Sequence, residues 1–201
     1  WWGVKKIWKS SDAGVSWTEI TPPSTLLSGD LWVPFDIAVS SNDENTLWAA
    51  RTSQYSGEYP NLDGRQVFKT LDGGATWSNV TSSDLDGESI TNITHQRGTD
   101  GGVYVGTRRA VYYKNNSSSN WHLFNNNLPL SSPSTKLIPY YKGGVIRNAT
   151  SRSVYECEFY ETAVPQAQIA ADKYKVSCFD TTVYFVDNSA LSNDNPTWQW
   201  S

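Results

Sequence analysis

Four carboxylates, Asp36, Glu58, Asp63 and Glu88, are candidates for the acid and base that cleave a glycosidic bond. That reaction needs two carboxyl groups flanking a cleft, roughly 5–10 Å apart depending on its stereochemistry. None of the four stands in a signature string. Asp36 opens an expected strand, where a carboxylate can instead accept backbone N–H groups. We therefore keep these residues as candidates and assign no catalytic residue from the sequence.

The histidines and cysteines indicate no metal or nucleophilic site. His95 and His122 are the two histidines, and their spacing suggests neither a metal pair nor a nucleophile–base pair. We expect both on half-buried strand faces. Cys157 and Cys178 form no CxxC string; they either pair across a domain boundary or remain two buried free thiols. We expect neither a metal nor a cofactor.

The elements that must position these groups are organised by a repeated turn motif, Ser/Thr-x-Asp-x-Gly-x-Ser/Thr-Trp. It occurs at 10–17 and again at 70–77, with the same spacing from aspartate to tryptophan. The aspartate can accept backbone N–H groups of the turn, the glycine can take a positive φ, and the tryptophan can carry its ring into the core. A degraded copy at 114–121 has Asn116 at the aspartate position.

These residues resemble the Asp-box (bacterial neuraminidase repeat) family of β-propellers. The resemblance implies a structural role for the motif, on the face opposite the ligand site. The family includes sialidases, xyloglucan-cleaving glycosidases and sortilin-like receptors, and the resemblance alone does not choose among them. The positions that match the motif are Asp12, Gly14, Trp17, Asp72, Gly74, Trp77, Asn116 and Trp121.

Composition and periodicity favour an all-β fold. Tryptophan (10) and tyrosine (11) are frequent, and no amphipathic helical stretch is present. Expected strands cover 34–40, 46–50, 66–70 and 77–81, then 89–96, 102–107, 110–114 and 121–125, then 136–141, 145–149 and 153–159. We interpret residues 1–161 as about three blades from the C-terminal part of a propeller. Because such an arc cannot close, we expect further blades outside this chain.

A ligand-binding surface is expected where the long loops of such blades gather. The loops 21–33, 52–65, 81–88, 108–109, 125–135 and 151–152 would share one face, which we call the long-loop face. Binding sites concentrate on loops held by a rigid scaffold, and aromatic and arginine side chains suit sugars and acidic groups. The candidates are Trp32, Tyr55, Tyr59, Arg65, Arg108, Arg109 and Arg152, with Arg51 near the same rim. The alternative for each arginine is a bond to a backbone carbonyl or simple solvation.

Residues 162–201 differ in character. The strings at 183–189 and 197–201 resemble the first half of a PKD (Ig-like) domain, whose later part would lie beyond Ser201. The net charge of −4 carries no block of like charge, which argues against general nucleic-acid or membrane-surface binding. No apolar run is long enough to cross a bilayer.

We therefore expect a scaffold fragment of a larger secreted or cell-surface protein that binds glycans or other surface polymers without catalysis. One alternative is a wall of the cleft of a secreted glycoside hydrolase of the sialidase or xyloglucanase type. A second is a structural or assembly protein, because an open arc exposes strand edges that can pair with another chain. The expected partners are a polysaccharide or glycoconjugate, the remaining blades and, in the second alternative, an assembly partner.

Overall fold

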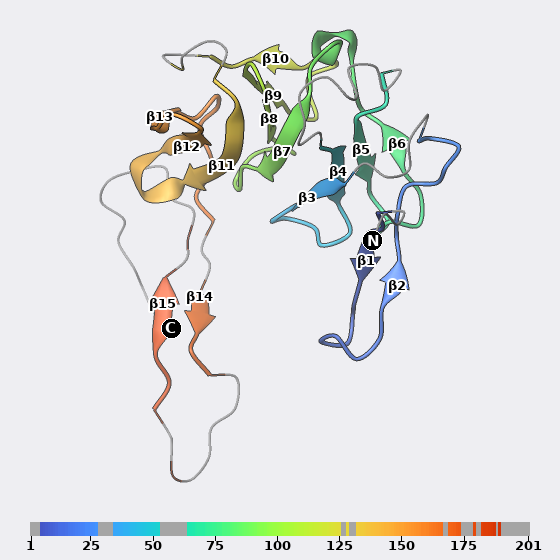
Figure 1. The fold of residues 1–201 in the computed structure, drawn as a ribbon. Coiled ribbons are helices and arrows are strands. Elements are labelled where there is room, and N and C mark those ends of the chain that lie inside the picture. The colour runs from blue at the N-terminus through green and yellow to red at the C-terminus, as the bar shows by residue number, and fades with distance from the viewer. Residues whose placement is uncertain are drawn as a thin grey trace.

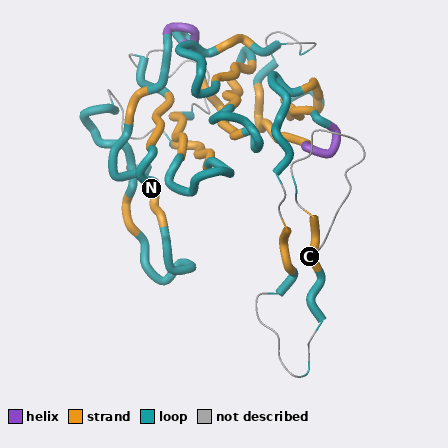
Figure 2. Tube along the Cα trace, turned by 180° about the vertical axis from the view of Figure 1, so that it is seen from behind, coloured by secondary structure: helices purple, strands orange, loops and turns teal. Residues whose placement is uncertain are grey.

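The structure, a computed structural model, describes residues 5–27, 34–52, 64–125, 128, 132–166, 169–173, 179, 182–187 and 189. Within these residues the chain is built from short antiparallel strands joined by turns and loops (Figures 1 and 2). Its two helical elements are single 3-10 turns, η1 (Ser83–Leu85) and η2 (Tyr141–Gly143). The all-β expectation is confirmed.

Two four-stranded meanders form the centre of the molecule. The first sheet contains β3 (Phe35–Val39), β4 (Leu47–Arg51), β5 (Val67–Thr70) and β6 (Ser78–Asn79). The second sheet repeats this order with β7 (Ile90–His95), β8 (Val103–Thr107), β9 (Val111–Lys114) and β10 (His122–Leu123). β4 and β8 are buried at every position, as expected for strands covered on both faces.

Partial units flank the two meanders. A hairpin of β1 (Trp8–Lys9) and β2 (Thr18–Glu19) precedes them. The third sheet follows, with β11 (Ser134–Tyr140), β12 (Val145–Thr150) and β13 (Val154–Glu158). A ribbon of β14 (Ile169–Ala171) and β15 (Phe185–Asp187) extends away from the sheets (Figure 1).

The sheets stack face to face as a propeller-like arc. β7 contacts β3 on one side and β11 on the other, so the first strands of the three sheets line the inside of the arc (Figure 1). One apolar cluster, which includes Ala38, Val67 and Ile93, fills the space between the first and second sheets. A second cluster, which includes Tyr104 and Leu137, joins the second sheet to the third.

The two complete motif turns are closed by the same hydrogen bonds. Asp72 Oδ1 accepts the Thr76 backbone N–H at 2.8 Å, and its Oδ2 accepts the Thr76 hydroxyl at 2.6 Å. Asp12 binds Ser16 at the same two distances. These bonds, the side-chain hydroxyl first, lower the pKa of both aspartates to about 2. Gly74 and Gly14 take the positive φ values that the turn requires, +98° and +90°.

The degraded third copy departs from the sequence alignment. Asn116, aligned with the aspartates, turns outward, donates to Asp100 Oδ1 at 2.7 Å and accepts from Lys69 Nζ at 2.6 Å. Its neighbour Asn115 binds the turn instead, because its Oδ1 accepts the Ser118 backbone N–H at 3.1 Å. An amide has one acceptor oxygen and therefore cannot reproduce the two-oxygen clamp of a carboxylate.

The motif tryptophans differ in burial. Trp121 is 2% exposed, Trp77 is half-buried, and Trp17 is 59% exposed. The expectation that the ring enters the core is therefore wrong for Trp17 within the described residues. The physical reason is local: β1 and β2 form a two-stranded sheet, and the described residues supply no other sheet beneath the Trp17 ring.

Candidate functional site

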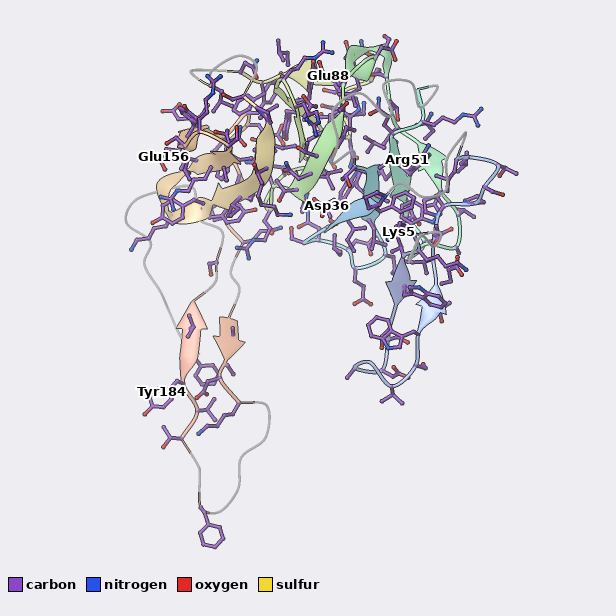
Figure 3. The ribbon with its side chains drawn as sticks, viewed as in Figure 1. Lys5, Asp36, Arg51, Glu88, Glu156 and Tyr184 are labelled. Carbon is purple, nitrogen blue, oxygen red and sulfur yellow. The ribbon has the colours of Figure 1, made fainter. Side chains whose placement is uncertain are left out.

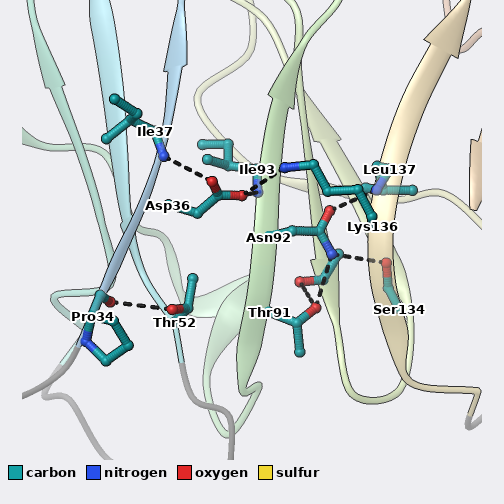
Figure 4. A network of polar contacts seen from close by, with 11 residues as sticks. Pro34, Asp36, Ile37, Thr52, Thr91, Asn92, Ile93, Ser134, Lys136 and Leu137 are labelled. Atoms are coloured by element: carbon teal, nitrogen blue, oxygen red, sulfur yellow. Dashed lines mark hydrogen bonds and ion pairs between the residues drawn. The ribbon is translucent and has the colours of Figure 1, made fainter. Parts of the chain in front are cut away.

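The inside of the arc is held by a contact that repeats from sheet to sheet. Asp36 on β3 accepts the Ile93 backbone N–H of β7 through Oδ2 at 3.0 Å. Asn92 on β7 accepts the Leu137 backbone N–H of β11 through Oδ1, also at 3.0 Å (Figure 4). β3 and β7 thus each use one polar side chain to bind the backbone of the next first strand, which aligns neighbouring sheets.

The Asp36 carboxylate, a catalytic candidate, has donors on both of its oxygens. Oδ1 accepts the Ile37 backbone N–H at 3.1 Å, and Lys136 Nζ lies 3.4 Å from Oδ2 (Figure 4). This is the alternative role considered for a carboxylate at the start of a strand. These hydrogen bonds give the Asp36 carboxylate a structural role as an acceptor and do not indicate a proton donor.

The second described carboxylate, Glu88, precedes β7 and is buried against the second sheet. Its Oε2 accepts the Thr107 hydroxyl at 2.7 Å, and its Oε1 accepts the Tyr112 hydroxyl at 3.3 Å. Burial, with a smaller contribution from the adjacent Glu88, raises the pKa of Tyr112 to about 12. Glu88 lies near η1, apart from Asp36 (Figure 3), so the structure does not bring these two together as a pair. Glu58 and Asp63 lie outside the described residues.

The four candidate arginines fall in equivalent connections between second and third strands. Arg65 precedes β5, Arg108 and Arg109 join β8 to β9, and Arg152 joins β12 to β13. Arg65 donates to the Thr25 carbonyl oxygen at 3.3 Å, and Arg109 donates to that of Gly87 at 3.2 Å. For these two the carbonyl-bonding alternative is confirmed, whereas Arg152 is exposed.

Other members of the expected long-loop face are buried or outside the described residues. Arg51, expected near the rim, is 2% exposed within the first sheet (Figure 3), because it ends a strand that is covered on both faces. Trp32, Tyr55 and Tyr59 lie outside the described residues.

Sequence reasoning missed a hollow of about 930 Å³ along the inside of the arc, whose lining includes β3, β7 and β11 residues and the turns that follow these strands. His95 lies in its wall, stacked on Trp48 at 5.3 Å, and burial lowers its pKa. Ser41 Oγ lies 3.3 Å from His95 Nε2 and donates to Gln166 Oε1 at 3.0 Å. These residues are 54 and 125 positions from Ser41, so no local pattern could have found them.

Gln166 reaches this hollow because the segment after β13 crosses the second sheet. The Tyr160 ring stacks on Tyr113 with a centroid separation of 4.5 Å. Gln96 Nε2 donates to the Glu161 carbonyl oxygen at 2.8 Å, and the Val164 N–H donates to the Gly98 carbonyl oxygen at 2.7 Å. The hydroxyl, imidazole and amide groups around Ser41 therefore join the first sheet, the second sheet and the segment after β13, and they offer donors and acceptors to a polar ligand.

The described residues hold no cluster of histidine, cysteine, aspartate and glutamate suited to a metal ion. They also contain no helix long and apolar enough to span a membrane. Cys157 is half-buried on β13 and is a free thiol within the part of the chain that the structure describes. Cys178 lies outside that part, so a bond between the two cysteines stays a prediction.

Comparison with known proteins relates this arc to propeller proteins. No protein-family profile matches the chain. A xyloglucanase from a Paenibacillus species is 26% identical over 138 residues, which cover 57% of this chain and 13% of the enzyme. The chain therefore spans about an eighth of that relative.

Two solved structures share the fold at low sequence identity. The GH74 enzyme of Niastella koreensis superposes with a TM-score of 0.53 at 17% identity, over 75% of this chain and 24% of the enzyme. YCF48 bound to a D1 peptide superposes with a TM-score of 0.52 at 9% identity, over 76% of this chain and 43% of YCF48. The chain is thus similar in sequence to part of a xyloglucanase and similar in fold to propeller-like proteins.

Proposed function

We propose that this chain is a non-catalytic arc of a longer secreted or cell-surface propeller protein, and that it binds polysaccharide on the long-loop face. The similarity to part of a xyloglucanase supports the ligand class. One observation carries the non-catalytic assignment: both described carboxylate candidates, Asp36 and Glu88, are held by hydrogen-bond donors of the chain itself. Retaining or inverting cleavage needs two carboxyl groups that reach the sugar.

The chemistry of the long-loop face suits sugar recognition. Arg152 is exposed in the tight turn between β12 and β13, and Arg65 and Arg109 are positioned by bonds to backbone carbonyls. Guanidinium groups held in this way keep further N–H donors for hydroxyl and carboxylate oxygens. A turn on a rigid sheet also loses little conformational freedom on binding.

The test is a polysaccharide pull-down on the intact parent protein, with the supernatant analysed for released oligosaccharides. We expect retention on xyloglucan that falls in Arg152→Ala and stays at the wild-type level in Lys142→Ala. Lys142 is the matched control, because it lies in η2 at the opposite end of β12. Equal retention of both variants, or no retention of the wild type, would contradict the proposal.

The alternative is that this arc forms one wall of the cleft of a glycoside hydrolase. Release of oligosaccharides by the parent would favour it. Alanine at Asp36, Glu58 and Glu88 in that parent then decides the matter: loss of turnover without loss of binding would place a catalytic acid in this chain. Unchanged turnover would leave the chain with a binding role alone.

A second candidate function, assembly with another protein, has its own observation. Three consecutive side chains of the ribbon region, Tyr184, Phe185 and Val186, are 66%, 63% and 55% exposed; Figure 3 labels Tyr184. We infer that this ribbon belongs to a separate Ig-like unit. Because Val164 and Gln166 bind the second and first sheets, we place the start of that unit after Gln166 and not at the expected residue 162. If it mediates assembly, the chain forms a stable oligomer in light scattering, and Tyr184→Ser with Phe185→Ser makes it monomeric.

A further inference from the structure

A small crevice lies between the first and second sheets, on the side that carries the motif turns. Its volume is about 190 Å³, and apolar side chains form part of its lining: Trp48, Val80, Val103 and Trp121. The rest of the lining is polar, and two lysines contribute to it, Lys69 from β5 and Lys114 from β9. The crevice is separate from the long-loop face and from the hollow inside the arc.

Both ammonium groups are bound to neutral acceptors. Lys69 Nζ lies 5.3 Å from the centre of the Trp48 ring and donates to Asn116 Oδ1 at 2.6 Å. Lys114 Nζ donates to the Ser118 carbonyl oxygen. Within the described ranges neither lysine forms an ion pair.

The nearby carboxylates are engaged elsewhere. Asp100 accepts the Asn116 side-chain amide at 2.7 Å. Asp84 accepts the Ser82 hydroxyl at 2.6 Å and the Trp121 backbone N–H at 3.2 Å. Both act on the lysines only through longer-range attraction.

Two positively charged groups therefore lie at one partly desolvated surface that is lined by tryptophan rings. Burial lowers the pKa of Lys69 and of Lys114, and the charge of Lys69 lowers the pKa of Lys114 further. Partial desolvation and mutual repulsion both disfavour the charged forms. An anion placed between the two ammonium groups would relieve both effects.

The origin of this arrangement is the degraded third copy of the motif. Asn116 stands where the complete copies have aspartate, and it has turned from its own turn toward Lys69. A carboxylate at this position would be an ion-pair partner for Lys69. The amide is neutral, so the two positive charges remain uncompensated by the motif.

We propose that this crevice binds an oxyanion, a sulfate or carboxylate group, between Lys69 and Lys114. The two ammonium groups supply the charge, and the tryptophan rings provide an apolar wall for the carbon skeleton that carries the anion. The Asn115 and Asn116 amides line the same space, but their N–H groups already donate to Glu161 and Asp100, so the lysines make the contacts with the anion. The volume admits one such group with part of its carrier. The site does not depend on polysaccharide binding at the long-loop face.

The experiment is a titration of the full chain with sodium sulfate at constant ionic strength, with sodium chloride as the balancing salt. The indole N–H resonance of Trp121, whose ring lines the crevice, reports binding. We expect a saturable shift in the wild type. Because a hydrogen bond to a charged group is lost, Lys69→Gln and Lys114→Gln should each raise the Kd about tenfold or more.

Two further variants separate binding from general salt effects and from misfolding. Lys142→Gln removes a charge in η2, which does not line the crevice, and should bind as the wild type does. Asn116→Asp keeps both lysines but supplies an internal carboxylate beside Lys69, so it should lose sulfate binding. It also replaces the amide that donates to Asp100 with a second carboxylate, so its Tm should not rise above that of the wild type. Wild-type affinity in Asn116→Asp or in both lysine variants would overturn the proposal, as would the absence of a saturable shift in the wild type.

A second titration identifies the source of the oxyanion. The competitors are polygalacturonate, which is acidic, and dextran, which is neutral. If polygalacturonate displaces sulfate from the crevice and dextran does not, the natural oxyanion is assigned to an acidic polymer. Binding of inorganic sulfate alone would assign the crevice to a free ion. Both results support an oxyanion site and leave the separate test of the long-loop face unaffected.

Discussion

The indole Nε1 of Trp121 donates a hydrogen bond of 3.0 Å to the carbonyl oxygen of Val80, which follows the outer strand of the preceding sheet. Trp77 makes the equivalent bond to Ile20 at 2.9 Å. Trp17, by contrast, donates to Gly14 within its own turn at 3.1 Å. The motif tryptophan is therefore a link between consecutive blades wherever the described chain supplies the preceding strand.

Replacing the motif tryptophan should lower the stability much more in one copy of the motif than in another. Trp121→Ala removes a ring that is 2% exposed, together with its hydrogen bond, and should lower the free energy of unfolding by about 3–5 kcal/mol. Trp17→Ala is the matched control; its ring is 59% exposed, so the loss should stay near 0.5 kcal/mol. Urea unfolding measures both, and equal losses would argue against the link.

The motif glycine should not tolerate a side chain. At Gly74, with φ of +98°, an added Cβ would lie 2.5 Å from Ile20 Cβ. Strain and overpacking together predict a loss of about 2–5 kcal/mol for Gly74→Ala. Gly87 also has a positive φ, +73°, but faces open space, so Gly87→Ala should cost about 1–2 kcal/mol. Thermal unfolding of the two variants gives the comparison; a smaller loss at Gly74 would refute it.

The motif aspartates should make the stability of the fold depend on pH in the acid range. The pKa of Asp72 is about 2 in the folded chain, lowered mainly by the Thr76 hydroxyl, and about 3.9 in an unfolded one. The folded state thus binds fewer protons, and its extra stability is present above the unfolded pKa and is lost as pH falls toward 2.

Asp72→Asn should therefore be less stable than the wild type at pH 7, and this difference should shrink between about pH 4 and 2. Asp86→Asn removes the same charge at an exposed position and should not reproduce the effect. Unfolding midpoints measured across this range test the prediction. A difference that is constant with pH would show that the carboxylate charge is not responsible.

The contact between first strands predicts unequal effects for the two partners of one ion pair. Asp36→Ala leaves the buried Ile93 N–H without its acceptor and should cost about 1–3 kcal/mol. Lys136→Met removes only an exposed ion pair with a separation of 3.4 Å and should cost at most about 1 kcal/mol. Chemical denaturation separates them; a larger loss for Lys136→Met would contradict the structural role given to Asp36.

Most strands could be read from local pattern. The expected strands at 34–40 and 102–107 appear as β3 and β8 with small changes at their ends. The outer strands were expected to be longer. β6 and β10 each retain only two residues, because they pair on one side and their side chains are exposed, so little burial extends them.

The sequence by itself determined the repeat, the antiparallel meanders and the closure of each complete motif turn, because these depend on residues close in the chain. Only the tertiary structure decided which polar groups are available for chemistry. Asp36 and Glu88 bind groups 57 and 19 residues away, and Lys69 meets Asn116 across two sheets. Such contacts depend on how the blades stack, because stacking brings together residues that are far apart in the sequence and follow no local pattern.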